Sequence, residues 1–313
     1  MNKLLPYISV VLAMLFWSVS GIAIKHALVA LPPFTMIVMR FTLAVLLMLI
    51  IGLICRKSTS LRLQKIEKKD IPLFLIAGFF QPFLYYLLET YSYNALSSPT
   101  IAEALLSTSP LLSPIFAAML LREKVTRNNI LGIIISTVGM LLLVLVGSSN
   151  FALGNPWGIL LAFGAVSTAV LYTVILRRIP QTYSNLSIVF WVQLISLALF
   201  YPVWGITEGS TALQQLAAQL PITTIHSDLA IALGCVAYLA FFASVIAFVL
   251  FCYTVRQIGV TQTNVFNNVR PVFTALWMLL FFGEQLPVGK WLGILLIILG
   301  LYVCQKIEKV DKY

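Results

Sequence analysis

Charged side chains are scarce in this chain. Asp, Glu, Lys and Arg make up 10% of its 313 residues, whereas soluble globular domains carry roughly 25%. Apolar residues make up 60% of the sequence, and the mean hydropathy is +0.99. A soluble chain of this size needs many more polar groups to cover its surface. The composition therefore excludes a soluble enzyme, a nucleic-acid-binding domain and a disordered protein, and it predicts that the lipid bilayer is the solvent.

Residues that carry catalysis or bind metals are also few. The two histidines, His26 and His226, both stand at the edges of apolar runs, whereas an intramembrane serine protease needs a His beside its Ser. No H-E-x-x-H motif and no P-loop occurs in the sequence, and the cysteines lack metal-ligand spacing. We therefore expect no catalytic residue, no metal and no cofactor, which excludes an enzyme and a self-contained ATP-driven pump. The four cysteines are Cys55, Cys235, Cys252 and Cys304.

Long apolar runs are what the chain has instead. A transmembrane helix needs ~20 mostly apolar residues, and ten runs meet this requirement. They are continuously apolar, whereas the strands of membrane barrels alternate. The sequence therefore predicts an all-α integral membrane protein with ten transmembrane helices. The expected spans are 5–27, 33–54, 71–93, 98–121, 127–147, 156–178, 183–205, 228–256, 260–283 and 287–305.

The basic residues predict how these spans are oriented, because Lys and Arg accumulate at cytoplasmic ends. Sixteen of the 20 lie at one set of boundaries, the opposite set holds only Lys290, and Lys25, Arg40 and Arg270 lie within runs. We expect both termini in the cytoplasm, 206–227 outside, and a location in the plasma (inner) membrane. The net charge of +10 reflects this topology, so no nucleic-acid partner is expected. The sixteen are Lys3, Arg56, Lys57, Arg62, Lys65, Lys68, Lys69, Arg122, Lys124, Arg127, Arg177, Arg178, Arg256, Lys306, Lys309 and Lys312.

The second half of the sequence repeats the first. A shift of 161 residues places Pro110 on Pro271, Glu123 on Glu284 and Gly139 on Gly300. Each half has five spans, so the second copy enters the membrane from the other side, which makes an inverted repeat of the kind found in secondary transporters. The predicted domains are residues 1–147 (first five-helix repeat), 156–305 (second, inverted repeat) and 306–313 (cytoplasmic tail).

Residues 89–143 and 259–303 resemble the paired EamA domains of the drug/metabolite transporter superfamily. The shared pattern is a mid-helix Pro, an apolar stretch, a Glu that ends the helix, and a Gly-containing span. The resemblance covers nearly the whole chain. It implies ten helices, a substrate cavity between the halves and transport of a small metabolite, often efflux. It does not imply a substrate, because the superfamily handles amino acids, sugars, nucleotide derivatives and drugs.

Ionisable residues within spans are functional candidates, because lipid disfavours them. Arg270 lies about ten residues into its span, ~15 Å deep and close to the midplane. Its counter-charge is either Glu89 or Glu103, backbone carbonyls, or an anionic substrate group; ligand contact and a structural ion pair stay open. Glu103 and Glu89 are candidates for proton coupling, since a partly buried carboxyl near another carboxylate has a raised pKa. The alternative is a neutral structural cluster of these two carboxylates with Arg40 and Lys25, which pins the helices together.

Span 260–283 also carries amides on one helical face, since Asn264, Asn267, Asn268 and Pro271 follow helical spacing. They predict a cavity lining, with interhelical hydrogen bonding as the alternative. Pro110 and Pro271 are candidate hinges or simple kinks. Aromatic and polar residues in other spans suit a pocket for a small amphiphilic molecule, although each singly also fits packing. These lining candidates are Trp17, Tyr85, Ser107, Tyr172, Trp191, Gln193 and Tyr238.

Two further carboxylates, Glu123 and Glu284, end their spans. A carboxylate is unfavourable at the C-terminus of a helix, so we do not expect them to cap the helices they end. The sequence predicts that they pair with the neighbouring Lys124, Arg127 or Lys290, outside the substrate site.

Together these patterns predict a secondary transporter. It is expected to move a small metabolite, amino-acid-like or carboxylate-bearing, across the plasma membrane by alternating access, as efflux and with proton coupling as an option. The alternatives are a transporter of cationic drugs or of nucleoside or sugar derivatives, and a lipid flippase. The expected partners are a small-molecule substrate and the lipid bilayer, and the expected state is a monomer or a homodimer.

Overall fold

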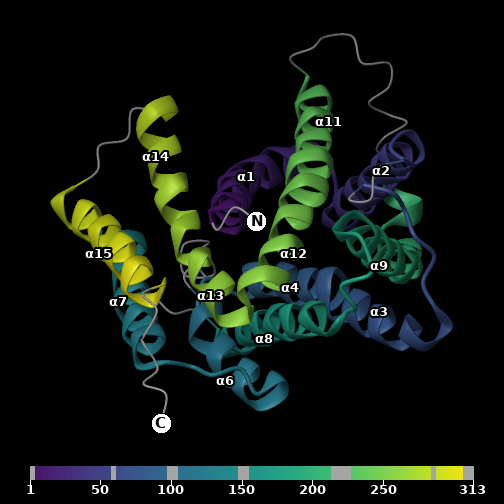
Figure 1. Cartoon of the computed structure of the whole chain (residues 1–313). Coiled ribbons are helices and arrows are strands. Elements are labelled where there is room, and N and C mark those ends of the chain that lie inside the picture. The colour runs from purple at the N-terminus through teal and green to yellow at the C-terminus, as the bar shows by residue number, and fades with distance from the viewer. Residues whose placement is uncertain are drawn as a thin grey trace. The chain divides into compact units, whose positions relative to one another are not determined.

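The structure is a computed structural model that describes residues 4–57, 61–96, 105–146, 155–212, 227–282 and 287–305. Every regular element in these ranges is helical (Figure 1). The elements are α1 (Leu5–Ala30), α2 (Pro33–Ile54), η1 (Lys68–Asp70), α3 (Ile71–Gly78), η2 (Phe79–Leu84), α4 (Tyr85–Ala95), α6 (Ser109–Leu121), α7 (Arg127–Leu145), α8 (Pro156–Arg178), α9 (Asn185–Thr207), α11 (Asp228–Tyr238), η3 (Leu239–Ile246), α12 (Ala247–Ile258), α13 (Val260–Asn264), η4 (Val265–Val269), α14 (Arg270–Phe282) and α15 (Val288–Gln305).

Seven helical runs in the described ranges are long and apolar enough to cross a membrane. This confirms the all-helical, multi-pass membrane class. Two of the other predicted spans correspond to shorter apolar helices, Ser109–Leu121 and Arg127–Leu143, and residues 98–104 of the fourth span lie outside the described part. The seven runs are Leu5–Ala30, Pro33–Ile54, Lys68–Ser92, Pro156–Arg178, Asn185–Thr207, Asp228–Ile258 and Val288–Gln305.

The chain forms two compact units, and each draws segments from both halves of the sequence. The first unit comprises Met1–Ser18, Leu84–Arg178 and Thr254–Tyr313. The second unit comprises Val19–Phe83 and Ile179–Tyr253. This division follows packing rather than the sequence repeat, so it does not bear on the predicted repeat boundaries.

The closest helix pair of the first unit is α7 and α15, which lie side by side (Figure 1). Glycines allow this approach: a Cβ on Gly132 would lie 2.5 Å from the carbonyl oxygen of Gly300, and one on Gly139 would lie 2.7 Å from that of Gly293. Small residues at such contacts let helix backbones meet in lipid, where packing rather than the hydrophobic effect drives association. The earlier glycine of α7, Gly132, meets the later glycine of α15, Gly300, and Gly139 meets Gly293. The two helices are therefore antiparallel.

In the second unit α2 and α3 pack against α9. The rings of Phe41 and Phe200 stack with their centroids 6.1 Å apart, and both side chains are buried. The Ser196 hydroxyl donates to the carbonyl oxygen of Gly78 at 2.7 Å, which ties α9 to the end of α3. Immediately after Gly78, α3 gives way to the π-helical segment η2.

Candidate functional site

Among the described residues, four of the predicted spans are interrupted helices, and one interruption is the turn at Ser107 in the span 98–121. In the second unit, η2 and η3 are π-helical, and Gln81 within η2 has an extended backbone (φ −150°, ψ 127°). In the first unit, the span predicted at 260–283 passes through the 3-10 segment η4 between α13 and α14. Such segments inside longer helices often mark functional sites or hinges. The sequence predicts a hinge or kink at Pro271 in the span 260–283, whereas the π-helical segments in the spans 71–93 and 228–256 were not expected.

The three Asn side chains that the sequence placed on one helical face contact three different helices in the structure. Asn264 donates through Nδ2 to the Thr173 hydroxyl of α8 at 3.2 Å, and Asn268 donates to the Ser136 hydroxyl of α7 at 2.9 Å. Both Asn side chains are buried. These contacts are the interhelical hydrogen bonds that the sequence analysis gave as the alternative to cavity lining. A role of either residue in binding stays a prediction.

Asn267 is the more accessible member of this group. It is half-buried and donates to the Ser109 hydroxyl at 3.0 Å, at the start of α6. Ser107 is buried in the turn just before α6. Pro110 and Pro271 both occupy early positions, in α6 and α14 respectively, where a missing backbone N–H removes no intrahelical hydrogen bond. The prolines thus follow the helix breaks, which is where a hinge is expected.

Arg270 is the first residue of α14 and is half-buried. The helix that carries it is fastened to α1 inside the first unit: Trp277 donates through Nε1 to the Ser18 hydroxyl at 3.0 Å, and the Thr274 hydroxyl reaches the Ser18 carbonyl oxygen at 3.1 Å. Trp17, a predicted lining residue, is the half-buried neighbour of Ser18. Arg270 therefore lies at the N-terminus of a helix that is hydrogen-bonded to α1, directly after the 3-10 segment η4.

Two predicted site residues, Tyr85 and Glu89, lie one turn apart on α4. The Tyr85 hydroxyl donates to Glu89 Oε1 at 2.9 Å, and both side chains are half-buried. Tyr172 of α8 belongs to the same unit and is 1% exposed. Glu103 lies outside the described residues, so its predicted role is untested.

The remaining predicted lining residues, Trp191, Gln193 and Tyr238, belong to the second unit. Gln193 is fully buried and donates through Nε2 to the Ser244 carbonyl oxygen in η3 at 2.6 Å. Arg40 donates through Nε to the hydroxyl of the same serine at 2.7 Å. This serine of the π-helical segment therefore joins α2 and α9.

Glu123 has a role that the sequence analysis missed. The chain leaves α6 through Arg122, whose backbone is left-handed (φ 54°), and Glu123 then accepts hydrogen bonds from the backbone N–H groups of Thr261 and Val260 at the start of α13. It therefore caps another helix instead of pairing with Lys124 or Arg127. The N-cap residue of α13 is Gly259, which has no side chain to accept a hydrogen bond. This missing local cap was the one sign in the sequence that a distant residue caps the helix.

The environment of this carboxyl has opposing effects on its protonation. Burial raises the pKa of Glu123 above its ordinary value of 4.5, while the two backbone N–H groups and the positive charge of Arg177 oppose the shift. Arg177 itself donates to the carbonyl oxygen of Arg256. The ends of α6, α8 and α12 and the start of α13 thus meet around one carboxylate in the first unit.

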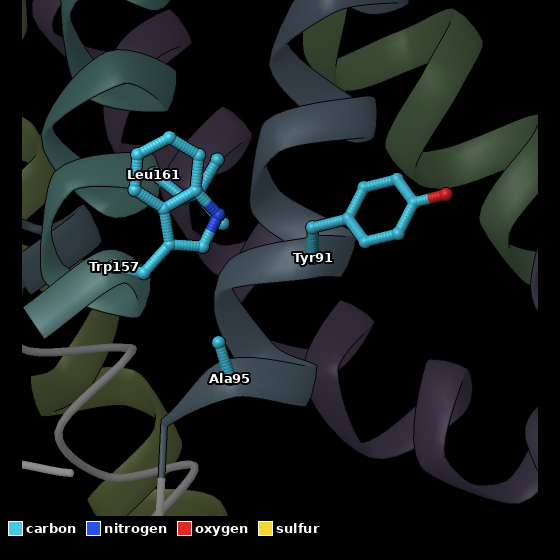
Figure 2. A pocket seen from close by; sticks show the side chains of 4 residues that line it. All are labelled: Tyr91, Ala95, Trp157 and Leu161. Atoms are coloured by element: carbon cyan, nitrogen blue, oxygen red, sulfur yellow. The ribbon is translucent and has the colours of Figure 1, made fainter. Parts of the chain in front are cut away.

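A surface cavity of about 380 Å³ lies between α4 and α8, and none of the predicted site residues that the structure describes lines it. Figure 2 shows Trp157 and Leu161 on α8 beside Ala95 on α4, with the ring of Tyr91 directed away from Trp157. Trp157 is 60% exposed. Exposed Trp and Tyr near span ends are typical of residues at the membrane–water interface.

Comparison with known proteins agrees with this architecture. The EamA-like transporter family matches residues 4–145 and 156–304. "Uncharacterized transporter YyaM" of Bacillus subtilis (strain 168) is 27% identical over 278 residues, which is 88% of this chain and 85% of that protein. An "Uncharacterized transporter" of Archaeoglobus fulgidus is 23% identical, covering 95% of this chain and 97% of that protein.

A solved crystal structure has the same fold, with a TM-score of 0.77 at 20% identity, and the match covers 97% of this chain and 99% of that one. At this identity the likeness establishes the fold alone. The family match, in contrast, extends over nearly the whole sequence and coincides with the apolar spans. The chain therefore belongs to the EamA-like transporter family and is a multi-pass membrane transporter, not an enzyme.

Proposed function

We propose that this chain is a secondary transporter that exports a small, amino-acid-like or other carboxylate-bearing metabolite across the plasma membrane by alternating access. The observation that carries the proposal is the set of interrupted helices. η2 and η3 begin 160 residues apart, at Phe79 and Leu239. The turn at Ser107 and the 3-10 residue Asn268 are 161 residues apart. Interruptions at corresponding positions of two repeats mark the substrate site in secondary transporters.

The pairing of α7 with α15 supports the inverted arrangement. The shift of 161 residues relates Gly132 to Gly293 and Gly139 to Gly300. Exchanging related residues converts the contact Gly132–Gly300 into the contact Gly293–Gly139, and both occur. Such reciprocity is the mark of a two-fold interface. Equivalent helices that run antiparallel are what an inverted repeat requires.

Arg270 supports the choice of a carboxylate. The guanidinium is planar and binds carboxylates with two parallel hydrogen bonds, and a fixed positive charge disfavours cationic drugs. Nucleoside or sugar derivatives and lipid flipping remain the rival functions, because amides and aromatic rings also suit uncharged polar ligands.

Proton coupling through Glu103 and Glu89 is the proposed energy source. In proteoliposomes preloaded with an unlabelled amino-acid mixture, external labelled substrate is expected to enter by counterflow, and a pH gradient is expected to drive net movement. Glu103→Gln should abolish the gradient-driven movement but keep counterflow. Glu89→Gln should have the smaller effect, because Tyr85 already donates a hydrogen bond to that carboxylate. Movement of labelled lipid without any solute would contradict the proposal and favour the flippase.

The orientation proposed for the spans has both termini in the cytoplasm. It is tested on a background without native cysteines by labelling Ser58→Cys and Ser210→Cys in intact cells. A membrane-impermeant maleimide is expected to label position 210 and to leave position 58 unlabelled until the cells are lysed. Labelling of position 58 in intact cells would reverse the orientation.

A further inference from the structure

A segment of the second unit, residues 61–67, runs without helical structure from the end of α2 toward η1. We call it the strap. Gln64 fixes it to the start of α9: its backbone N–H donates to the Ser187 hydroxyl at 2.9 Å, its Nε2 donates to the Thr182 carbonyl oxygen at 2.9 Å, and its Oε1 accepts from the backbone N–H of Ser184 at 2.5 Å. Both serine hydroxyls also donate to the Arg62 carbonyl oxygen.

Two aromatic side chains hold the strap at further points. Trp191 donates through Nε1 to the Gln64 carbonyl oxygen at 2.8 Å. The Tyr183 hydroxyl accepts from the backbone N–H of Glu67 at 3.0 Å and donates to Asp70 Oδ2 at 2.7 Å. The strap therefore has a fixed course along α9, set mainly by bonds to its backbone.

The side chains of this region present positive charge outward. Six basic residues from the end of α2 through η1 are exposed, namely Arg56, Lys57, Arg62, Lys65, Lys68 and Lys69. Of the two acidic residues here, Glu67 pairs with Lys69 at 2.7 Å and Asp70 accepts from Tyr183. Neither carboxylate neutralises Arg62, Lys65 or Lys68.

Exposed apolar residues flank these charges. Ile54 at the end of α2 is 78% exposed, and Leu61 and Ile71 are exposed as well. The helical runs on either side, Pro33–Ile54 and Lys68–Ser92, are candidate membrane spans. Apolar side chains in lipid next to basic side chains place the strap at the depth of the lipid headgroups.

We propose that the strap and its basic residues form a docking surface for the anionic headgroups of phospholipids in the leaflet that this end of the spans meets. Basic residues near a membrane surface attract anionic lipids, each by roughly a fivefold gain in affinity. Basic residues that serve only to orient the spans in the membrane need their charge but no fixed backbone. Here the backbone is held at Arg62, Gln64 and Glu67, so the charges are arranged before any lipid arrives, which lowers the entropic cost of binding.

The test uses the purified full-length chain and measures the dissociation constant for phosphatidylglycerol in detergent micelles by native mass spectrometry, with phosphatidylcholine as the neutral lipid. The triple variant Arg62→Gln/Lys65→Gln/Lys68→Gln is expected to bind phosphatidylglycerol on the order of a hundredfold more weakly. Its binding of phosphatidylcholine and its thermal midpoint should not change, because the strap is fixed through the Arg62 backbone and not through these side chains.

The matched control is Arg122→Gln/Lys124→Gln/Arg127→Gln, which removes the same charge from exposed residues between the end of α6 and the first residue of α7. It should weaken phosphatidylglycerol binding less than the strap variant does; equal losses in the two triple variants would overturn the proposal. Gln64→Ala keeps every charge but removes the two side-chain bonds to Thr182 and Ser184, just before α9, and it should weaken binding about fivefold. Unchanged binding would contradict the role of the fixed backbone. Competition by glycerol phosphate at the same concentration as the lipid would assign the surface to a free phosphate instead.

Discussion

Replacing Gly259 by alanine is expected to lower the free energy of unfolding by about 2–4 kcal/mol. The backbone there has φ +93° and ψ 176°, a region that essentially only glycine occupies. A Cβ at this position would also lie 2.0 Å from Glu123 Oε1, so the carboxylate must leave the N–H groups that it caps. Both effects act at the start of the helix that leads to Arg270. The measurement is the shift of the unfolding midpoint in detergent.

Gly234→Ala is the matched control, because a Cβ there meets nothing within 4 Å and alanine favours the helix. It should be neutral or slightly stabilising. Glu123→Ala should cost about 0.5–2 kcal/mol from the lost cap, and the double variant with Gly259→Ala should lose less than the sum, since the clash is then absent. Strict additivity would show that backbone strain alone explains the effect of Gly259→Ala.

Substitution of Arg270 is expected to have the largest effect on ligand binding. Arg270→Gln should weaken the binding of a carboxylate substrate by about ten- to hundredfold, the usual range for a hydrogen bond to a charged group. Arg270→Lys keeps the charge but loses the planar fork, so it should fall between the wild type and Arg270→Gln. The dissociation constants are measured by isothermal titration in detergent. Equal affinities of wild type and Arg270→Lys would show that only the charge matters.

A control is needed because Arg270 begins α14, and its substitution can also disturb the packing of this helix. Thr274→Val removes a neighbouring hydroxyl that is bonded to the Ser18 and Arg270 carbonyl oxygens without touching the guanidinium. This variant should lower the unfolding midpoint and leave the dissociation constant nearly unchanged. A similar loss of affinity in Thr274→Val would mean that binding follows the stability of this helix end and not the guanidinium.

The sequence predicted the membrane class well, because twenty-residue apolar runs have few physical alternatives. It predicted Asn264, Asn267 and Asn268 less well. Their spacing assumes 3.6 residues per turn, and a short 3-10 segment of three residues per turn turns them toward different helices. Pro271 is a local signal for a kink, but the local sequence does not say which partner each amide takes. The partners are the hydroxyls of Thr173, Ser109 and Ser136 on other helices.

Glu123 shows a second limit of the same kind. Its sequence neighbours are basic, so a local rule predicts local ion pairs. The left-handed backbone of Arg122 instead directs the carboxylate to N–H groups more than 130 residues further along the chain. Long-range partners of this type are settled by tertiary packing, whereas the Lys and Arg distribution and the 161-residue repeat are properties of the sequence itself.

The central claim, that Arg270 recognises a substrate carboxylate, is tested most directly with a matched pair of ligands. The affinities of a carboxylate ligand and of its amide analogue are measured for the wild type and for Arg270→Gln. The account predicts that the wild type prefers the carboxylate by about ten- to hundredfold and that this preference disappears in Arg270→Gln, while the affinity for the amide hardly changes. An equal loss of affinity for both ligands in the variant would contradict it and would show that Arg270 holds the helices together instead.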